Sequence, residues 1–142
     1  MPRRAEGIRH QIGRRGAILL ILALIDFAYG GSLVAPSDEL ASSSATMWRQ
    51  HIAPIWAWGA AWLVVGVILF VSAFLRNDAI GYAAAIGWKI IWAATTLASW
   101  AFGGVPRGWV ATIIWAVFGG MIWVIAEWPE PTLPPPTDEG AR

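Results

Sequence analysis

Four long apolar stretches alternate with short polar ones along this chain. They cover residues 16–35, 55–75, 79–102 and 109–128, and each contains at least 20 residues. A helix rises about 1.5 Å per residue, so about 20 apolar residues cross a hydrocarbon core of about 30 Å. The pattern therefore predicts an all-α fold, an integral membrane four-helix bundle with four transmembrane spans.

The polar connections differ in length. Residues 76–78 and 103–108 are long enough only for turns between antiparallel helices, and Asp78 is placed to cap the helix that follows it. Residues 36–54 form the longest connection and are rich in serine. We interpret this segment as a solvated loop, with a short amphipathic turn on the membrane surface as the alternative.

Composition supports a membrane protein. Apolar residues make up 57% of the chain and charged residues 13%, with a mean hydropathy of +0.56 and 11 tryptophans. Soluble domains carry about 25% charged residues, and a chain this short cannot bury so much apolar surface in water. The expected partner is therefore the lipid bilayer.

The same composition argues against several kinds of chemistry. The chain has no cysteine, and its two histidines, His10 and His51, lie outside the spans without other ligands nearby in the sequence. This excludes disulfides and Cys-based metal sites. We expect no metal, no cofactor and no enzymatic activity.

Both ends of the chain are polar. Residues 1–15 contain five arginines, which favours a basic cytoplasmic leader held by anionic lipid. Without interleaved aromatic residues, this leader does not indicate nucleic-acid binding. Residues 129–142 are rich in proline and predict a disordered cytoplasmic tail.

Basic residues also predict orientation. With both termini inside, the inner segments hold seven arginines, and the outer loops hold two, Arg49 and Arg107. This distribution predicts a multi-pass protein of the cell (inner) membrane with cytoplasmic N- and C-termini. A cleaved signal peptide ending near 28–30 is the alternative for the first span, but apolar character resumes after Asp26 and favours a full crossing.

Two charges fall inside the predicted spans. Asp26 and Lys89 each lie ten residues from the predicted cytoplasmic start of their spans, so both should lie near the membrane midplane. A charge at that depth costs roughly 3 kcal/mol or more unless it finds a partner. We therefore expect an intramembrane charge pair, either purely structural or part of a proton relay or polar path.

The helical face of Lys89 is small and polar, as expected of a protein interior. Trp88 and Trp92 lie close to Lys89 in the sequence, and either ring is a candidate to cover its ammonium group. Thr96 and Ser99 extend the same face as a candidate polar lining. Ordinary core packing is the competing interpretation of all four residues.

Small residues four apart mark candidate helix contacts. In lipid, helices associate through close packing over such positions. We expect contacts, within one chain or between chains of a homo-oligomer, at three pairs: Gly81 with Ala85, Ala83 with Gly87, and Ala116 with Gly120.

Two resemblances follow from this layout. An arginine-rich leader, four spans of which the last three are rich in tryptophan, and a hydrophilic tail resemble small membrane proteins of actinobacteria and their phages, including holins. That resemblance implies a self-associating protein without catalysis. A carboxylate in the first of four spans is also similar to that of small multidrug-resistance transporters. That resemblance implies proton-coupled transport through Asp26, although this chain has Asp for Glu, a longer first loop and Lys89. A structural membrane assembly protein is a third possibility.

Overall fold

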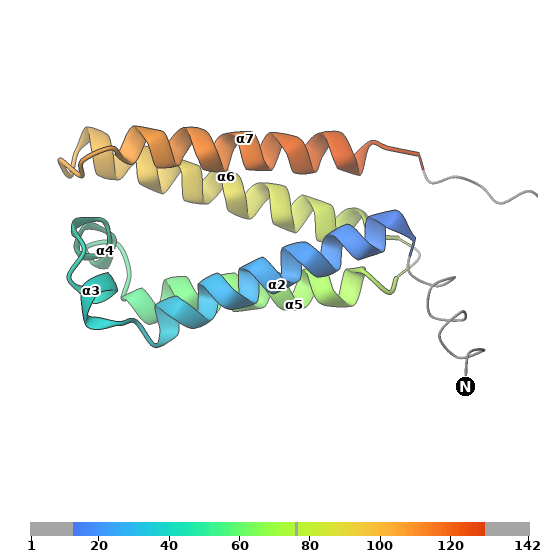
Figure 1. Cartoon of the computed structure of the whole chain (residues 1–142), viewed down its shortest axis with the longest axis horizontal. Coiled ribbons are helices and arrows are strands. Elements are labelled where there is room, and N and C mark those ends of the chain that lie inside the picture. Colours follow the sequence, from blue (N-terminus) through green and yellow to red (C-terminus); the bar gives the residue numbers. More distant parts are fainter. Residues whose placement is uncertain (1–12, 76, 130–142) are drawn as a thin grey trace, which may run out of the picture.

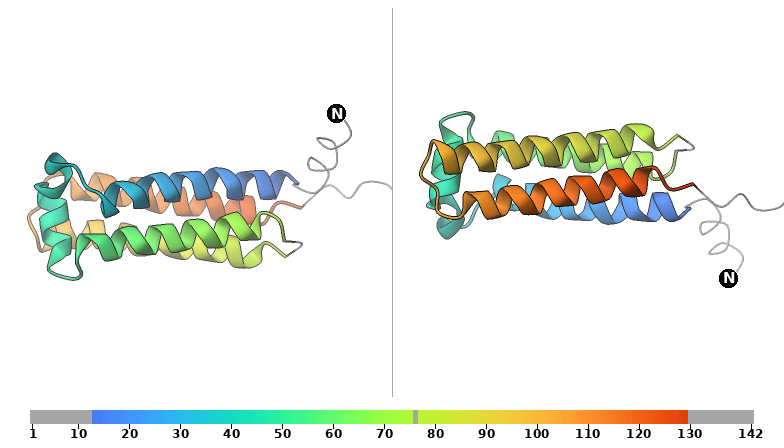
Figure 2. Two further views of the ribbon diagram at one scale, coloured as in Figure 1. Left: turned by 90° about the horizontal axis from the view of Figure 1, so that it is seen from below. Right: turned by 90° about the horizontal axis from the view of Figure 1, so that it is seen from above.

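Four long helices run side by side in the computed structural model (Figures 1 and 2). The structure describes residues 13–75 and 77–129; the predictions for the leader up to residue 12 and for the tail from residue 130 lie outside this part. The four helices are α2 (Arg14–Val34), α5 (Ile55–Ser72), α6 (Ala79–Ala101) and α7 (Gly108–Ala126). Each is long and apolar enough to cross a membrane, and the described residues contain no strand. The predicted all-α class with four candidate spans is confirmed.

The helices are arranged as two close pairs, α2 with α5 and α6 with α7, which α5 and α6 connect. Glycines permit the close approach within each pair. A Cβ atom on Gly30 would lie 2.9 Å from the carbonyl oxygen of Gly59, and one on Gly108 would lie 3.0 Å from that of Thr96. Only a residue without a side chain allows backbones to approach so closely.

The connection between α2 and α5 is not the loop that we expected. It contains two short helices, α3 (Asp38–Ala41) and α4 (Ser44–Gln50), and the Ser37 and Ser43 side chains accept hydrogen bonds from backbone N–H groups at their starts. Serine at these positions satisfies N–H groups that have no partner within the helix. The serine-rich composition therefore reflects helix capping as well as solvation.

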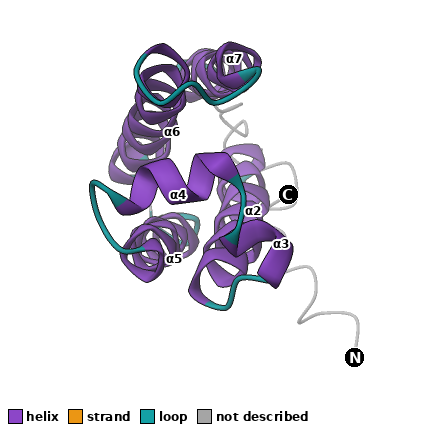
Figure 3. Cartoon of the chain, turned by 90° about the vertical axis from the view of Figure 1, so that its left-hand side faces the viewer, coloured by secondary structure: helices purple, strands orange, loops and turns teal. Residues whose placement is uncertain are grey.

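Helix α4 lies across one end of the bundle (Figure 3). Its Trp48 ring packs on the turn between α6 and α7, where a Cβ atom on Gly103 would lie 2.1 Å from Trp48 Cδ1. Thr46 and Arg49 are buried. We call this the α4 end of the bundle, and the opposite end, where α2 begins, the Arg15 end.

At the Arg15 end, one arginine connects three helices. Arg15 donates from Nε and Nη2 to the two carboxylate oxygens of Asp78, at 2.7 and 2.9 Å, and from Nη1 to the carbonyl oxygen of Trp128 at 3.2 Å. The expected cap is therefore wrong: Asp78 makes no side-chain cap to α6, and Asn77 Oδ1 accepts the hydrogen bond from Ala79 N–H instead. A bidentate arginine is the stronger partner for a carboxylate.

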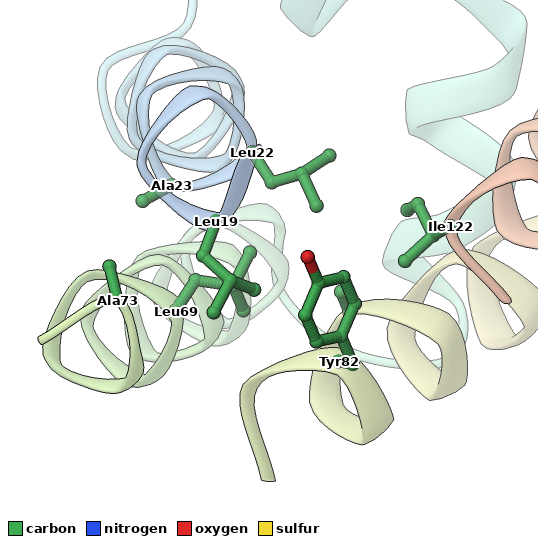
Figure 4. Close-up of a cluster of buried hydrophobic side chains, with 8 residues drawn as sticks. Leu19, Leu22, Ala23, Leu69, Ala73, Tyr82 and Ile122 are labelled. Atoms are coloured by element: carbon green, nitrogen blue, oxygen red, sulfur yellow. The ribbon is translucent and has the colours of Figure 1, made fainter. Parts of the chain in front are cut away.

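Between this end and the middle of the bundle lies an apolar core (Figure 4). Leu22 of α2, Tyr82 of α6 and Ile122 of α7 point toward one another there, with Leu19 and Leu69 beside them. All five are at least 96% buried. This core joins the two helix pairs on the Arg15 side of the site described below.

Candidate functional site

The two intramembrane charges meet in the interior of the bundle. Lys89 of α6 donates a hydrogen bond from Nζ to Oδ1 of Asp26 on α2, and both side chains are completely buried. The second carboxylate oxygen, Oδ2, is also buried and has no hydrogen-bond partner in the described part of the chain. The ion pair therefore joins one helix pair to the other and leaves one acceptor unused.

Aromatic rings surround the lysine, but they are not the rings that we expected. Lys89 Nζ lies 4.1 Å from the ring centroid of Trp62 and 5.9 Å from those of Trp115 and Phe118. Trp88 and Trp92, its neighbours in sequence, do not cover its ammonium group. Trp88, at i−1, starts from a different direction around the helix. Trp92, at i+3, lies on the same face as Lys89, but its ring faces Arg49 instead, at 4.4 Å.

Toward the α4 end, the rings continue as a cluster. Neighbouring centroids lie 4.5 to 6.3 Å apart, many of them edge to face, which is the contact range of aromatic pairs. We call it the aromatic cluster; its members are Tyr29, Trp58, Trp62, Trp88, Trp92 and Trp115. Four of its indole N–H groups are buried without a hydrogen-bond partner among the described residues: those of Trp58, Trp62, Trp88 and Trp92.

Arg49 of α4 lies against the aromatic cluster at the α4 end, although its position in the sequence indicated only an arginine of the outer loop. Its guanidinium carbon lies 4.4 Å from the centroid of Trp92, and the residue is 7% exposed. Burial lowers the pKa of Arg49, whereas the nearby Tyr29 raises it to a smaller extent. The arginine stays charged in proteins even so.

The hydroxyl groups predicted to line a path bond to the backbone instead. Thr96 Oγ1 lies 2.8 Å from the Ala93 carbonyl oxygen and 3.0 Å from Thr112 Oγ1, and Ser99 donates to the Thr96 carbonyl oxygen at 2.7 Å. Both residues are buried. Thr96 therefore connects α6 to α7 through Thr112, whereas Ser99 bonds within α6.

The predicted small-residue pairs divide into two groups. Gly81 and Ala85 are buried, and a Cβ atom on Gly81 would lie 2.6 Å from Ser72 Cβ. On α7 it is Gly119, not Gly120, that faces α6. The remaining members of the predicted pairs lie on uncovered or partly covered surface: Ala83, Gly87, Ala116 and Gly120.

Two shallow grooves run along this uncovered surface near the Arg15 end. One, of about 450 Å³, lies between α6 and α7 and is lined by Ala83, Gly87 and Trp123, with Arg15 and Glu127 at its polar end. The other, of about 380 Å³, is almost entirely apolar and includes Gly120. Both grooves open outward from α7, the helix with the fewest buried residues of the four.

Comparison with known proteins adds no family: no family model, curated protein or solved structure matches the chain. Within the described ranges, no group of three or more His, Cys, Asp or Glu residues is placed to hold a metal ion. The features that can support a function are therefore the buried Asp26–Lys89 ion pair, the aromatic cluster with Arg49, and the uncovered surface of α6 and α7.

Proposed function

We propose that this chain is a non-enzymatic multi-pass protein of the inner membrane that self-associates through α7 and the adjoining face of α6. Four helices of spanning length support the membrane assignment. The seven-to-two distribution of arginines supports cytoplasmic termini. By its resemblance to small phage membrane proteins, the assembled form would permeabilise the bilayer, as a holin does.

The observation that carries this proposal is the position of Gly87 and Gly120. A Cβ atom on either residue would have nothing within 4 Å, so neither glycine is required by packing inside one chain. Gly31 is equally open, but Gly87 and Gly120 line the two grooves beside α7 and Gly31 lines neither. Glycine in a helix interior costs about 1 kcal/mol relative to alanine. A second copy that brings its own helix against this face gives both glycines a role, because close backbone approach is what stabilises helix pairs in lipid.

Cysteine cross-linking should detect this association, since the natural chain contains no cysteine. Gly120→Cys in the full chain should form disulfide-linked dimers in membranes under mild oxidation. The matched control is Gly31→Cys, because Gly31 is an equally open glycine on α2, away from the proposed face. Equal cross-linking at both positions, or none at Gly120, would refute association through this face.

Permeabilisation should depend on the same face. Induced expression in a bacterial host should collapse the membrane potential abruptly after a delay, because lesions form only when enough subunits have associated. Gly120→Ile should lengthen that delay or abolish the collapse, whereas Gly31→Ile should leave the timing unchanged. A gradual loss of potential that scales with expression, and is equal in both variants, would count against the holin-like action.

Proton-coupled transport is the second candidate, and one observation favours it. Asp26 Oδ2 is a buried acceptor without a partner in the described residues, and an intramembrane carboxylate with a free oxygen can take up a proton. Lys89 opposes the binding of a cation beside it, because it already neutralises Asp26. For this reason we rank transport below self-association.

A further inference from the structure

The α4 end of the aromatic cluster has hydrogen-bond donors in excess. Arg49 and the four indole groups contribute N–H donors only, because neither guanidinium nor indole can accept a hydrogen bond. The Tyr29 hydroxyl, which lies near Trp92 and Arg49, is the acceptor that the cluster itself supplies, and the donors outnumber it. Arg49 Nε and the indole nitrogens of Trp58, Trp62, Trp88 and Trp92 are all buried without partners among the described residues. Buried polar groups in native proteins are nearly always hydrogen-bonded, so an excess of unpartnered donors on one set of touching rings calls for a further acceptor.

The charge at this place is also unbalanced. No carboxylate forms a salt bridge with Arg49 in the described ranges, and its cation faces the Trp92 ring at 4.4 Å. A ring face attracts a cation but does not neutralise it. Asp26, the one buried carboxylate among the described residues, is already paired with Lys89.

We propose that Arg49 and the indole N–H groups of the aromatic cluster bind a small monovalent anion, such as chloride, at the α4 end of the bundle. The donor set supplies one positive charge and several N–H groups, which matches a single negative charge with several acceptor directions. The rings lie within contact distance of one another, at 5.2 to 6.3 Å between the centroids of the four tryptophans. Rings in contact with one another leave no room for an extended headgroup, so the ligand must be compact.

Chloride binding should be visible as stabilisation of the full-length protein in detergent. Sodium chloride is titrated in place of sodium gluconate at constant ionic strength, because gluconate is too bulky for a residue that is 7% exposed. The midpoint of thermal unfolding should rise and saturate with chloride, as expected when a ligand binds only the folded state. A response that does not saturate, or no response, would overturn the proposal.

Variants separate the site from general salt effects. Arg49→Gln should raise the apparent dissociation constant for chloride at least about tenfold, since a charge-assisted hydrogen bond is lost. Arg107→Gln is the matched control, because Arg107 is an exposed arginine in the other turn at the same end, and it should respond like the wild type. An Arg49→Gln response equal to that of the wild type would refute the site.

Two further measurements complete the test. One uses a second variant in case Arg49→Gln does not fold, and the other asks whether the anion is a lipid phosphate rather than a free ion. Trp92→Phe keeps a ring beneath Arg49 but removes one donor, so it should fold and bind chloride more weakly; unchanged binding by this variant would contradict a role for the indoles. In vesicles of phosphatidylcholine, added phosphatidylglycerol should not replace the chloride effect. Stabilisation by that lipid alone would overturn the small-anion site in favour of a lipid phosphate.

Discussion

Asp26→Asn and Lys89→Met should each destabilise the folded protein by about 3 to 5 kcal/mol, because each leaves an uncompensated buried partner. The double variant should recover much of that loss, since the attraction within a buried pair is largely offset by the cost of removing both charges from water. Unfolding by a denaturing detergent, followed through tryptophan fluorescence, measures all three differences. Both side chains are completely buried, so solvent will not screen the effect.

The Arg15 and Asp78 pair provides the matched control. It is also a salt bridge between α2 and the start of α6, but its side chains are 21% and 20% exposed. Partly exposed pairs contribute about 1 kcal/mol or less, so Asp78→Asn should have a much smaller effect than Asp26→Asn. Additive losses in the Asp26 and Lys89 double variant would show that the two charges do not act as a pair.

The double variant also distinguishes the two candidate functions. If the pair only joins the helix pairs, the folded double variant should still permeabilise membranes. If Asp26 carries protons, the double variant should fold and lose proton-coupled transport. Folding and activity are therefore measured on the same preparation.

Gly30→Leu should destabilise the protein by about 2 to 3 kcal/mol or prevent α2 from packing on α5, because overpacking a tight contact forces the backbones apart. A Cβ atom on Gly30 would lie 2.9 Å from the Gly59 carbonyl oxygen and 3.0 Å from the Leu63 side chain. The Gly59 carbonyl oxygen belongs to the helix backbone, so it cannot move aside as the end of a flexible side chain could. The same detergent unfolding assay measures the loss.

The adjacent glycine is the control for this prediction. A Cβ atom on Gly31 would have nothing within 4 Å, and the residue is exposed. Gly31→Leu should therefore leave stability unchanged or raise it slightly, because leucine favours helix more than glycine does. Similar losses at both positions would mean that helix propensity or lipid contact, rather than the crossing of α2 and α5, determines the cost.

The length of the apolar stretches was enough to predict the four helices. The contacts between the helices also depend on how each helix is rotated about its axis, which a single sequence does not reveal. The expected spans and the observed helices agree to within three residues at every end. Asp26 and Lys89 were expected together because two buried charges at equal depth have few other partners. The ring over Lys89 was not predictable, since any of 11 tryptophans is chemically suitable and only the rotation of each helix selects Trp62.

The adjacent glycines also show that helix rotation cannot be predicted from this sequence. In each of the pairs at 30–31 and 119–120, one residue faces another helix and its neighbour faces outward. Successive residues differ by about 100° around a helix, so composition cannot tell which of the two is buried. Arg49 was not predicted as a site residue because the segment 36–54 indicated at most a short amphipathic turn on the membrane surface, whereas α4 packs over the end of the bundle and brings Arg49 onto Trp92.

The separation of the ion pair along the chain has a consequence for biosynthesis. Asp26 and Lys89 are 63 residues apart. At about 5 to 20 residues per second, Lys89 is synthesised about 3 to 13 s after Asp26. During that interval α2 and α5 can already pair through their glycines, but Asp26 has no lysine with which to form an ion pair. A ribosome that stalls before α6 would therefore leave a half-bundle with a lone buried carboxylate, a substrate suited to membrane quality-control proteases.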